Sequence, residues 1–168
     1  MRNVLFQFNR MAVCASAGLL VAGCAVKPPQ KPPHRQAAHA ATSVRCQPAQ
    51  PGDAAIGNWY GVRSQRGVAG KMHVLIHLRA DGTMSYEEEL KRGKRPSQAL
   101  NETGCWRRDK QGLVLRTTMS NGDPVELADP IYTNRYAVRS QSRQHMELNG
   151  PFGPLGVRRM PGDYRLPF

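Results

Sequence analysis

The sequence predicts an all-β domain, in which short antiparallel strands form a small meander that closes into a barrel or a strongly curved sheet. Apolar and polar residues alternate along several short runs, the pattern typical of half-buried strands. Turn-forming pairs such as Asp81-Gly82 and Asn121-Gly122 separate these runs. The stretch KRGKRPSQALNE comes nearest to a helix, but it is short and is interrupted by Gly93 and Pro96. The pattern therefore favours strands over helices.

The first hairpin is expected in KMHVLIHLRADG and in the TMSYEEEL that follows it, with the turn at Asp81-Gly82. Alternation places one set of its side chains on a single face of the first strand: Met72, Val74, Ile76 and Leu78. The opposite face carries the residues between them: His73, Leu75, His77 and Arg79.

A second pair of strands is expected in ETGCWRRD and GLVLRTTM, around a turn at Lys110-Gln111-Gly112. IYTNRYAV continues the alternation with two distinct faces: Ile131, Thr133, Arg135 and Ala137 on one, and Tyr132, Asn134, Tyr136 and Val138 on the other. HMEL follows and ends at Asn149-Gly150.

The first 23 residues have the organisation of a targeting segment. Residues 1–10 carry Arg2 and Arg10 and no acid, and residues 11–22 are apolar and uncharged. This apolar run suits a secretory signal, because about 20 apolar residues are needed to span a bilayer. The following Val21-Ala22-Gly23-Cys24 resembles a bacterial lipobox, in which small residues flank the scissile bond and the cysteine thiol accepts a diacylglyceryl group.

This resemblance implies that residues 1–23 are a signal peptide and that Cys24 becomes an acylated N-terminus, whose palmitate-type chains lie in a membrane. Ala25 after the cysteine, rather than aspartate, implies anchoring in the outer membrane with the protein on the periplasmic face. The alternative is an ordinary secretory signal that is cut elsewhere, with Cys24 incidental.

Residues 24–55 are expected to form a disordered tether, because Pro, Ala and Gln dominate and no apolar period is present. It is either a solvated spacer or a segment that adheres to anionic lipid or cell-wall polymer through its basic residues: Lys27, Lys31, His34 and Arg35. Residues 56–168 are then the β domain.

Two G-x-W tripeptides sharpen the fold prediction: Gly57-Asn58-Trp59 and Gly104-Cys105-Trp106. A G-x-W that enters the first strand of a barrel resembles the lipocalin-like group, in which the tryptophan plugs one barrel end and a basic residue of a late strand covers it. The resemblance implies that Trp59 and Trp106 lie at a barrel end and that Arg158 or Arg159 is the cover. True lipocalins are longer and carry a C-terminal helix, so a small lipocalin-like lipoprotein domain of the bacterial envelope is the better description.

The remaining cysteines are expected to pair. Cys14 leaves with the signal and Cys24 carries lipid, so that Cys46 and Cys105 are left in an oxidising periplasm. Such a bridge would hold the end of the tether beside Trp106. The alternative is a Cys46 that is free for intermolecular exchange and a Cys105 that is simply buried.

Few residues suggest chemistry. On one strand, His73 and His77 would lie about 13 Å apart, too far to share a metal ion. Residues 87–89, all glutamate, are expected at a solvated strand edge that discourages pairing with other strands. Neither a nucleophile elbow nor a phosphate-binding glycine loop occurs. We therefore expect no enzyme activity, no catalytic residue, no metal and no cofactor.

The charge balance favours an anionic partner. Lys and Arg number 24 against 12 Asp and Glu, which gives a formal net charge of +12. We expect no nucleic acid partner, because aromatic residues are only 7% of the chain and the basic residues are scattered. The densest basic cluster is either a solvated loop or a contact for an acidic protein, lipopolysaccharide phosphates or a glycan: Lys91, Arg92, Lys94 and Arg95.

The C-terminal segment GPFGPLGVRRMPGDYRLPF is rich in proline and apolar residues. We expect it to fold back over the barrel as a plug or strap through its larger side chains: Phe152, Leu155, Met160, Tyr164 and Phe168. The alternative is a docking peptide for another envelope protein.

Three functions fit these features. The first is a lipid-anchored, non-enzymatic binding or assembly module that contacts another envelope protein or an anionic envelope polymer. The second is a carrier or sensor of a small apolar ligand, which would need an open apolar cavity in the barrel. The third is an inhibitor or immunity lipoprotein that blocks a wall-degrading enzyme with the loop of residues 91–95. Oligomeric state is left open.

Overall fold

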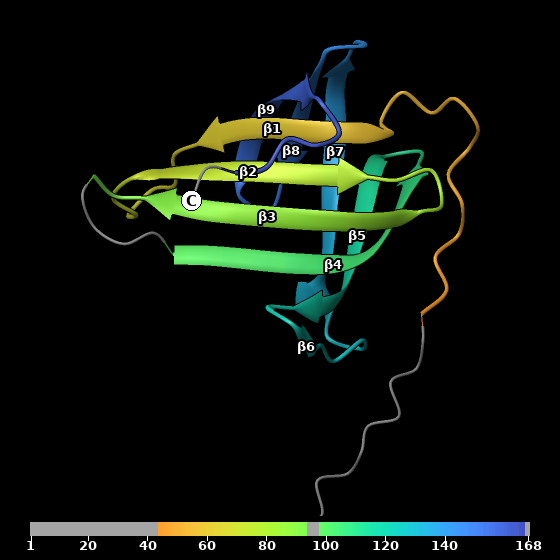
Figure 1. The fold of residues 1–168 in the computed structure, drawn as a ribbon, viewed down its shortest axis with the longest axis horizontal. Coiled ribbons are helices and arrows are strands. Elements are labelled where there is room, and N and C mark those ends of the chain that lie inside the picture. The colour runs from red at the N-terminus through yellow and green to blue at the C-terminus, as the bar shows by residue number, and fades with distance from the viewer. Residues whose placement is uncertain (1–43, 94–97, 167–168) are drawn as a thin grey trace, which may run out of the picture. The chain divides into compact units, whose positions relative to one another are not determined.

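Eight antiparallel strands form a closed barrel, with one short additional strand, in the computed structural model of this chain, which describes residues 44–93 and 98–166 (Figure 1). The strands are β1 (Gly57–Arg63), β2 (Lys71–Leu78), β3 (Thr83–Lys91), β4 (Gln98–Asp109), β5 (Gly112–Ser120), β6 (Asp123–Pro124), β7 (Thr133–Gln141), β8 (His145–Gly150) and β9 (Gly153–Met160). A 3-10 turn, Pro130–Tyr132, precedes β7. Within the described ranges, the chain has no helix of the length and apolar character needed to cross a bilayer.

Each strand of the barrel pairs with the strand next to it in the chain, and the barrel closes where β9 pairs with β1. The two-residue β6 is the exception, because it pairs only with the end of β5. Figure 1 shows β1 to β4 running across the front of the barrel, with β5 and β7 crossing behind them at a steep angle. The predicted antiparallel meander and its closure are confirmed.

The strand faces follow the alternation in the sequence. Val74, Ile76 and Leu78 point into the barrel and are at most 2% exposed, whereas Met72, at the start of β2, is only partly buried. The turn that follows is also as predicted: Gly82 has a positive φ of 81°, and the Asp81 carboxylate accepts bonds from the amide and hydroxyl of Thr83. Because every second residue faces inward, side chains from all eight strands converge in the interior.

The described interior is filled by large side chains. Trp59, Trp106 and Met84 are each at most 2% exposed. They belong to one cluster that also takes in residues from the other walls: Tyr86, Leu113, Leu115, Tyr136, Met146, Leu148, Leu155 and Val157. Burial of this apolar surface is the main favourable contribution to folding.

The C-terminal segment contributes a strand, which corrects the predicted strap. Leu155 and Met160 lie in β9, where Leu155 enters the core, while Phe152 is 55% exposed at the preceding turn. The expected folding back applies only to the last described residues, which lie over the outer face of β1. There the Tyr164 ring packs edge-on against Tyr60, 5.5 Å between centroids. Phe168 lies outside the described residues.

The barrel also incorporates residues that the sequence assigns to the tether. Ala55 is fully buried, and the Ala49 amide donates to the carbonyl of Ala80 at 2.9 Å. Asp53 receives two hydrogen bonds from the Arg108 guanidinium, at 2.9 and 3.0 Å. Residues 44–55 are therefore part of the folded domain. Residues 1–43, with the predicted signal peptide and acylated Cys24, lie outside the described residues.

Candidate functional site

Trp59 and Trp106 both lie at the end of the barrel where the chain enters β1 and turns from β2 to β3. The Trp59 indole N–H donates to the carbonyl of Ala55 at 2.7 Å, and that of Trp106 donates to the carbonyl of Arg79 at 2.8 Å. Buried indoles need such partners, because an unpaired N–H in the core is costly. Both bonds tie the end of the barrel to the segments that cross it.

Arg159 is the residue that covers Trp59. Its guanidinium carbon lies 4.3 Å from the ring centroid, and its N–H groups donate to the carbonyls of Ile56 and Ala54. Gly57 makes this approach possible, because a Cβ at that position would collide with the Arg159 guanidinium. Arg158, the other candidate, instead lies 5.4 Å from the centroid of the Tyr60 ring and is exposed. This end of the barrel is a structural closure, in which both indoles and the Arg159 guanidinium are bonded to backbone carbonyls.

An ion pair lies inside the barrel, where the sequence predicts a solvated strand edge. Arg63 Nη2 lies 2.8 Å from Glu88 Oε2, and the two side chains are only 6% and 11% exposed. The Tyr86 hydroxyl donates to the same carboxylate oxygen. Glu89, on the other face of β3, is 1% exposed. The prediction of a solvated strand edge at residues 87–89 is wrong, because β3 pairs with β2 on one side and with β4 on the other.

Burial dominates the titration of the groups around this ion pair. Desolvation raises the pKa of Tyr136 to about 12 and also raises the pKa of Tyr86. Desolvation likewise raises the pKa of Glu102, although the Thr117 hydroxyl that donates to it opposes the shift. Every group here has a partner within the barrel, so the cluster holds the interior together.

The predicted partner-binding cluster is only partly described. Lys91 ends β3, and its Nζ lies 3.6 Å from the buried Glu89 carboxylate. Arg92 follows it and is half-buried. Lys94 and Arg95 lie outside the described residues. Of the two described residues, Lys91 is therefore paired with a carboxylate of the barrel.

The two histidines of β2 lie on its outer face and have different neighbours. His73 Nδ1 is 2.7 Å from the Tyr60 hydroxyl. Burial, with Arg79 and Arg165 nearby, lowers the pKa of His77. In the described part of the chain, no group of three or more His, Cys, Asp or Glu side chains is placed to hold a metal ion.

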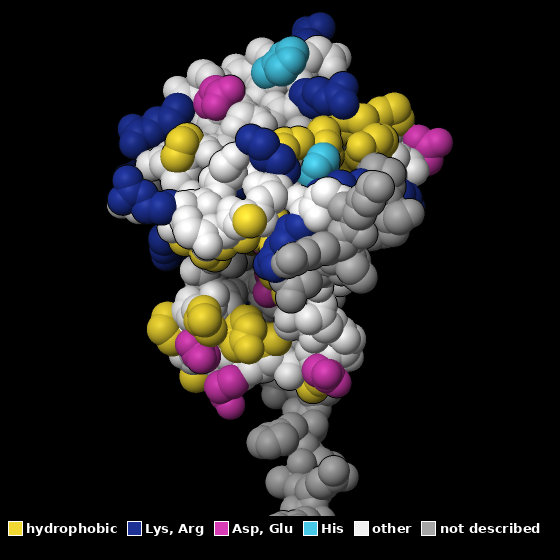
Figure 2. All heavy atoms as spheres, turned by 90° about the vertical axis from the view of Figure 1, so that its left-hand side faces the viewer, with side chains coloured by type: hydrophobic (Ala, Val, Ile, Leu, Met, Phe, Trp, Pro, Cys, Tyr) yellow, Lys and Arg dark blue, Asp and Glu magenta, His cyan; other side chains and the backbone are white. Residues whose placement is uncertain are grey.

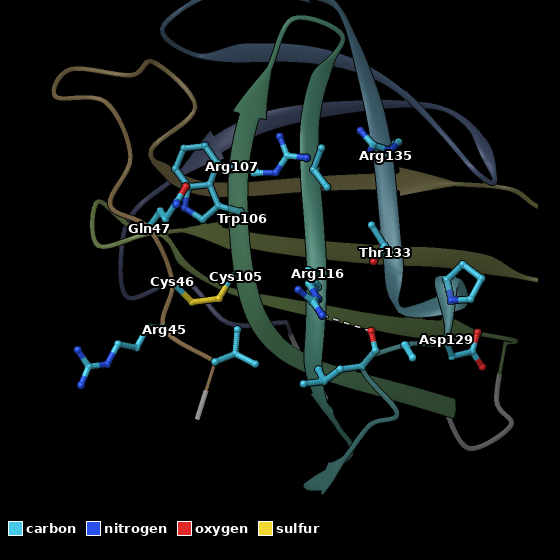
Figure 3. A pocket seen from close by; sticks show the side chains of 15 residues that line it. Arg45, Cys46, Gln47, Cys105, Trp106, Arg107, Arg116, Asp129, Thr133 and Arg135 are labelled. Atoms are coloured by element: carbon cyan, nitrogen blue, oxygen red, sulfur yellow. Dashed lines mark hydrogen bonds between the residues drawn. A yellow bond between two sulfur atoms is a disulfide. The ribbon is translucent and has the colours of Figure 1, made fainter. Parts of the chain in front are cut away.

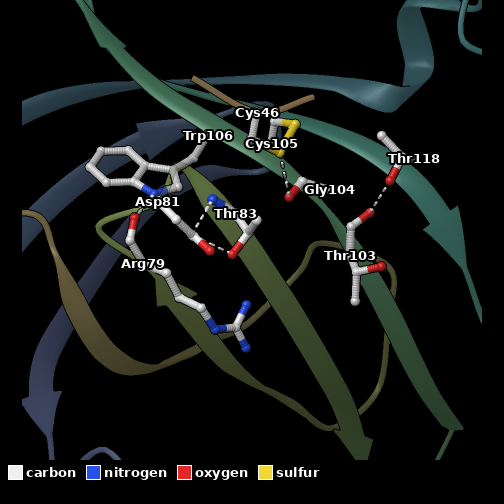
Figure 4. The surroundings of a disulfide bond; sticks show 9 residues. All are labelled: Cys46, Arg79, Asp81, Thr83, Thr103, Gly104, Cys105, Trp106 and Thr118. Atoms are coloured by element: carbon white, nitrogen blue, oxygen red, sulfur yellow. Dashed lines mark hydrogen bonds between the residues drawn. A yellow bond between two sulfur atoms is a disulfide. The ribbon is translucent and has the colours of Figure 1, made fainter. Parts of the chain in front are cut away.

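Cys46 and Cys105 form the predicted disulfide, which fastens the segment before the barrel to β4 (Figure 4). Gly104, next to it, lies where β4 shifts register against β5. A Cβ at Gly104 would collide with the carbonyl of Arg116, so the second G-x-W motif needs its glycine for close strand approach. The disulfide thus sets residues 44–47 against the outer face of β4.

A groove of about 440 Å³ opens on the outside of the barrel beside this disulfide (Figure 3). Its floor is the outer face of β4, β5 and β7. Its two sides are residues 44–47 and residues 127–130, which follow β6. Four arginines line it: Arg45, Arg107, Arg116 and Arg135. We call this feature the arginine groove.

Strand register brings three of these arginines together. Arg107 of β4 pairs with Val114 of β5, which pairs in turn with Arg135 of β7. Arg116 lies on the same face, two residues further along β5. The three side chains therefore leave the strands around Val114, which is 5% exposed and forms an apolar floor. Arg45 extends away from them in Figure 3.

Acceptors at the edge of the arginine groove orient these guanidiniums. Arg135 and Arg107 both donate to Asp109 Oδ2, at 2.9 and 3.4 Å, and Arg116 donates to the carbonyl of Leu127 at 3.3 Å. The amides of Gln111 and Gly112 also donate to Asp109, and together with the arginines they lower its pKa. Asp109 is thus a fixed anion that aligns two cations.

An acidic segment borders the arginine groove on one side. Asp123, Glu126 and Asp129 are all exposed in the chain between β5 and β7. Figure 2 shows acidic and apolar side chains together in the lower part of the domain, the β6 region of Figure 1, while Lys and Arg dominate above. Asp129, from this acidic segment, is itself part of the lining of the arginine groove.

The sequence alone did not predict the arginine groove, although its alternation correctly placed Arg135 and Thr133 on one face of their strand.

Comparisons with protein-family descriptions, with curated proteins and with solved structures find no match to this chain. Its function is therefore inferred from its own residues.

Proposed function

We propose that this chain is a lipid-anchored protein of the outer membrane, facing the periplasm, and that its barrel is a non-enzymatic binding module for an anionic envelope component. The single observation that carries the binding role is the arginine groove, where arginines of three strands project around the apolar floor of Val114. Val21-Ala22-Gly23-Cys24 supports the anchor.

The filled interior favours surface binding over transport of an apolar ligand. A carrier needs an apolar cavity of several hundred Å³. The inward face of β2 instead packs against Trp59, Met84 and Tyr86. The arginine groove also ranks above the loop of residues 91–95 as a contact site, since it brings together arginines of three strands, whereas Lys91 is paired with Glu89.

Site-specific photo-crosslinking in intact cells tests this function. A photo-reactive residue at Ala128, which is exposed and lines the arginine groove, should capture one defined envelope component. The same residue at Gln144, exposed in the turn before β8, is the matched control and should capture none. Capture from Gln144 but not from Ala128 would contradict the proposal.

A further inference from the structure

We propose that the arginine groove binds the oxyanion head, a phosphate ester or a carboxylate, of a small amphiphilic molecule. This inference rests on the proposed binding role and names the chemical class of the ligand. The head would lie over Val114, among Arg107, Arg116 and Arg135, and the apolar part would lie along residues 127–130.

The orientation of the guanidiniums supports an oxyanion. A guanidinium has five N–H donors in a planar fork that matches carboxylate and phosphate geometry. The bonds of Arg135 and Arg107 to Asp109, and of Arg116 to the Leu127 carbonyl, each use one of these donors. The side chains are thereby held in place with donors to spare, which lowers the entropic cost of binding.

The charge of the arginine groove is only partly neutralised. Arg107 and Arg135 share one carboxylate, that of Asp109, whereas Arg116 donates to a neutral carbonyl. Asp129, also in the lining, uses one carboxylate oxygen to accept from the Ile131 amide at 3.0 Å, which keeps it at the start of the 3-10 turn. The net positive charge favours an anion, while the acidic chain between β5 and β7 opposes a flat, uniformly anionic surface.

The remaining lining explains why the ligand should be amphiphilic and small. Val114 is buried, and Leu127, Ala128 and Pro130 form an apolar side. Val44 and the disulfide close the opposite side. A volume of about 440 Å³ is within the range of small-molecule sites. An apolar segment next to an oxyanion would fill both parts of this lining.

Calorimetric titration of the full chain, purified in a non-ionic detergent, tests the inference. Hexyl phosphate and hexanoate supply a phosphate or a carboxylate head on a short apolar chain, glycerol 3-phosphate supplies the head alone, and hexyl glucoside supplies the chain with a neutral head. We expect hexyl phosphate or hexanoate to bind at least about tenfold more tightly than both single-feature probes, because both parts of the lining contribute. The tighter of the two identifies the head.

The triple variant Arg107→Gln, Arg116→Gln, Arg135→Gln should lose this binding while keeping the melting temperature of the parent within a few degrees. The matched control removes three exposed arginines outside the arginine groove, Arg66→Gln, Arg139→Gln and Arg143→Gln, and should bind as the parent does. Because partition of each probe into the detergent is the same for all three proteins, it does not affect the comparison between them.

The inference is overturned if the triple variant still binds hexyl phosphate as the parent does, or if hexyl glucoside binds equally well. It is also overturned if neither hexyl phosphate nor hexanoate binds the parent. If neither probe binds but Ala128 still captures a component in cells, the ligand class proposed here is wrong, whereas the proposed binding function is supported.

Discussion

The guanidinium carbon of Arg159 lies 4.3 Å from the centre of the Trp59 ring, so that the last strand of the barrel caps the first. The same side chain donates to two carbonyls in the segment before β1. One residue thereby joins three parts of the chain: β9, β1 and residues 54–56.

Arg159→Ala should lower the free energy of unfolding by about 2–3 kcal/mol, because it removes a cation–π contact and three charge-assisted hydrogen bonds, the third to the carbonyl of Arg143. Urea unfolding measures this change. Arg158→Ala is the control, and its exposed side chain should contribute less than about 1 kcal/mol. An equal effect from the two variants would show that Arg159 does not close the barrel.

Loss of the disulfide should destabilise the domain substantially. Cys46 and Cys105 are 59 residues apart, and a crosslink of that length contributes about 4 kcal/mol in the chain-entropy model. The double variant Cys46→Ala, Cys105→Ala should therefore unfold at lower urea concentration, and a reducing agent should shift the parent in the same direction. A double variant that is unaffected by the reducing agent and as stable as the oxidised parent would refute this contribution.

The buried ion pair of Arg63 and Glu88 predicts a non-additive result. Glu88→Leu leaves a buried guanidinium without its carboxylate and should cost about 3–5 kcal/mol. The double variant Arg63→Met, Glu88→Leu removes both charges and should be more stable than Glu88→Leu alone. Urea unfolding of the two single variants and the double variant gives the coupling free energy; strict additivity would contradict a direct pairing.

Asp53 predicts a loss of stability in acid. Burial alone would raise its pKa, but hydrogen bonds from Arg108 and from the Ala55 amide outweigh burial and lower the pKa below the ordinary value of 3.8. The contribution of the Asp53 carboxylate to the free energy of unfolding is thus complete above its pKa in the unfolded chain, near 4. It is lost as the pH falls through the lower pKa of the folded state.

Asp53→Asn should reduce the free energy of unfolding at pH 7 by about 1 kcal/mol and should flatten its pH dependence below pH 5. Asp163→Asn, in the exposed C-terminal segment, is the control. Stability curves from pH 2 to pH 7 check this; a curve for Asp53→Asn that is parallel to that of the parent would contradict the assignment.

Much of the fold could be read from the sequence because its signals are local. Alternation, Asp81-Gly82 and Asn121-Gly122 indicated strands and turns that the structure contains. β9 was missed because its prolines and glycines suggested a strap, although Leu155 and Val157 alternate inward as a strand requires. Pro154 is tolerated there because β9 pairs with β1 only from Val157 to Met160, so that the start of the strand has a partner on one side only.

The candidate site was harder to predict because it depends on register. Arg107 and Arg135 come from strands that do not pair with each other, and only their common partner Val114 brings them to one row. The buried pair of Arg63 and Glu88 was missed for a related reason: three consecutive glutamates look solvated until the closed barrel places the middle one inside.

The arginine groove as a contact site is tested most directly by the yield of the crosslink from Ala128 in cells. With a photo-reactive residue at that position, the parent and the control variant (Arg66→Gln, Arg139→Gln, Arg143→Gln) should give the same product. The variant Arg107→Gln, Arg116→Gln, Arg135→Gln should lose it almost completely at equal protein level. An undiminished yield from that variant would contradict a role for the arginine groove in binding.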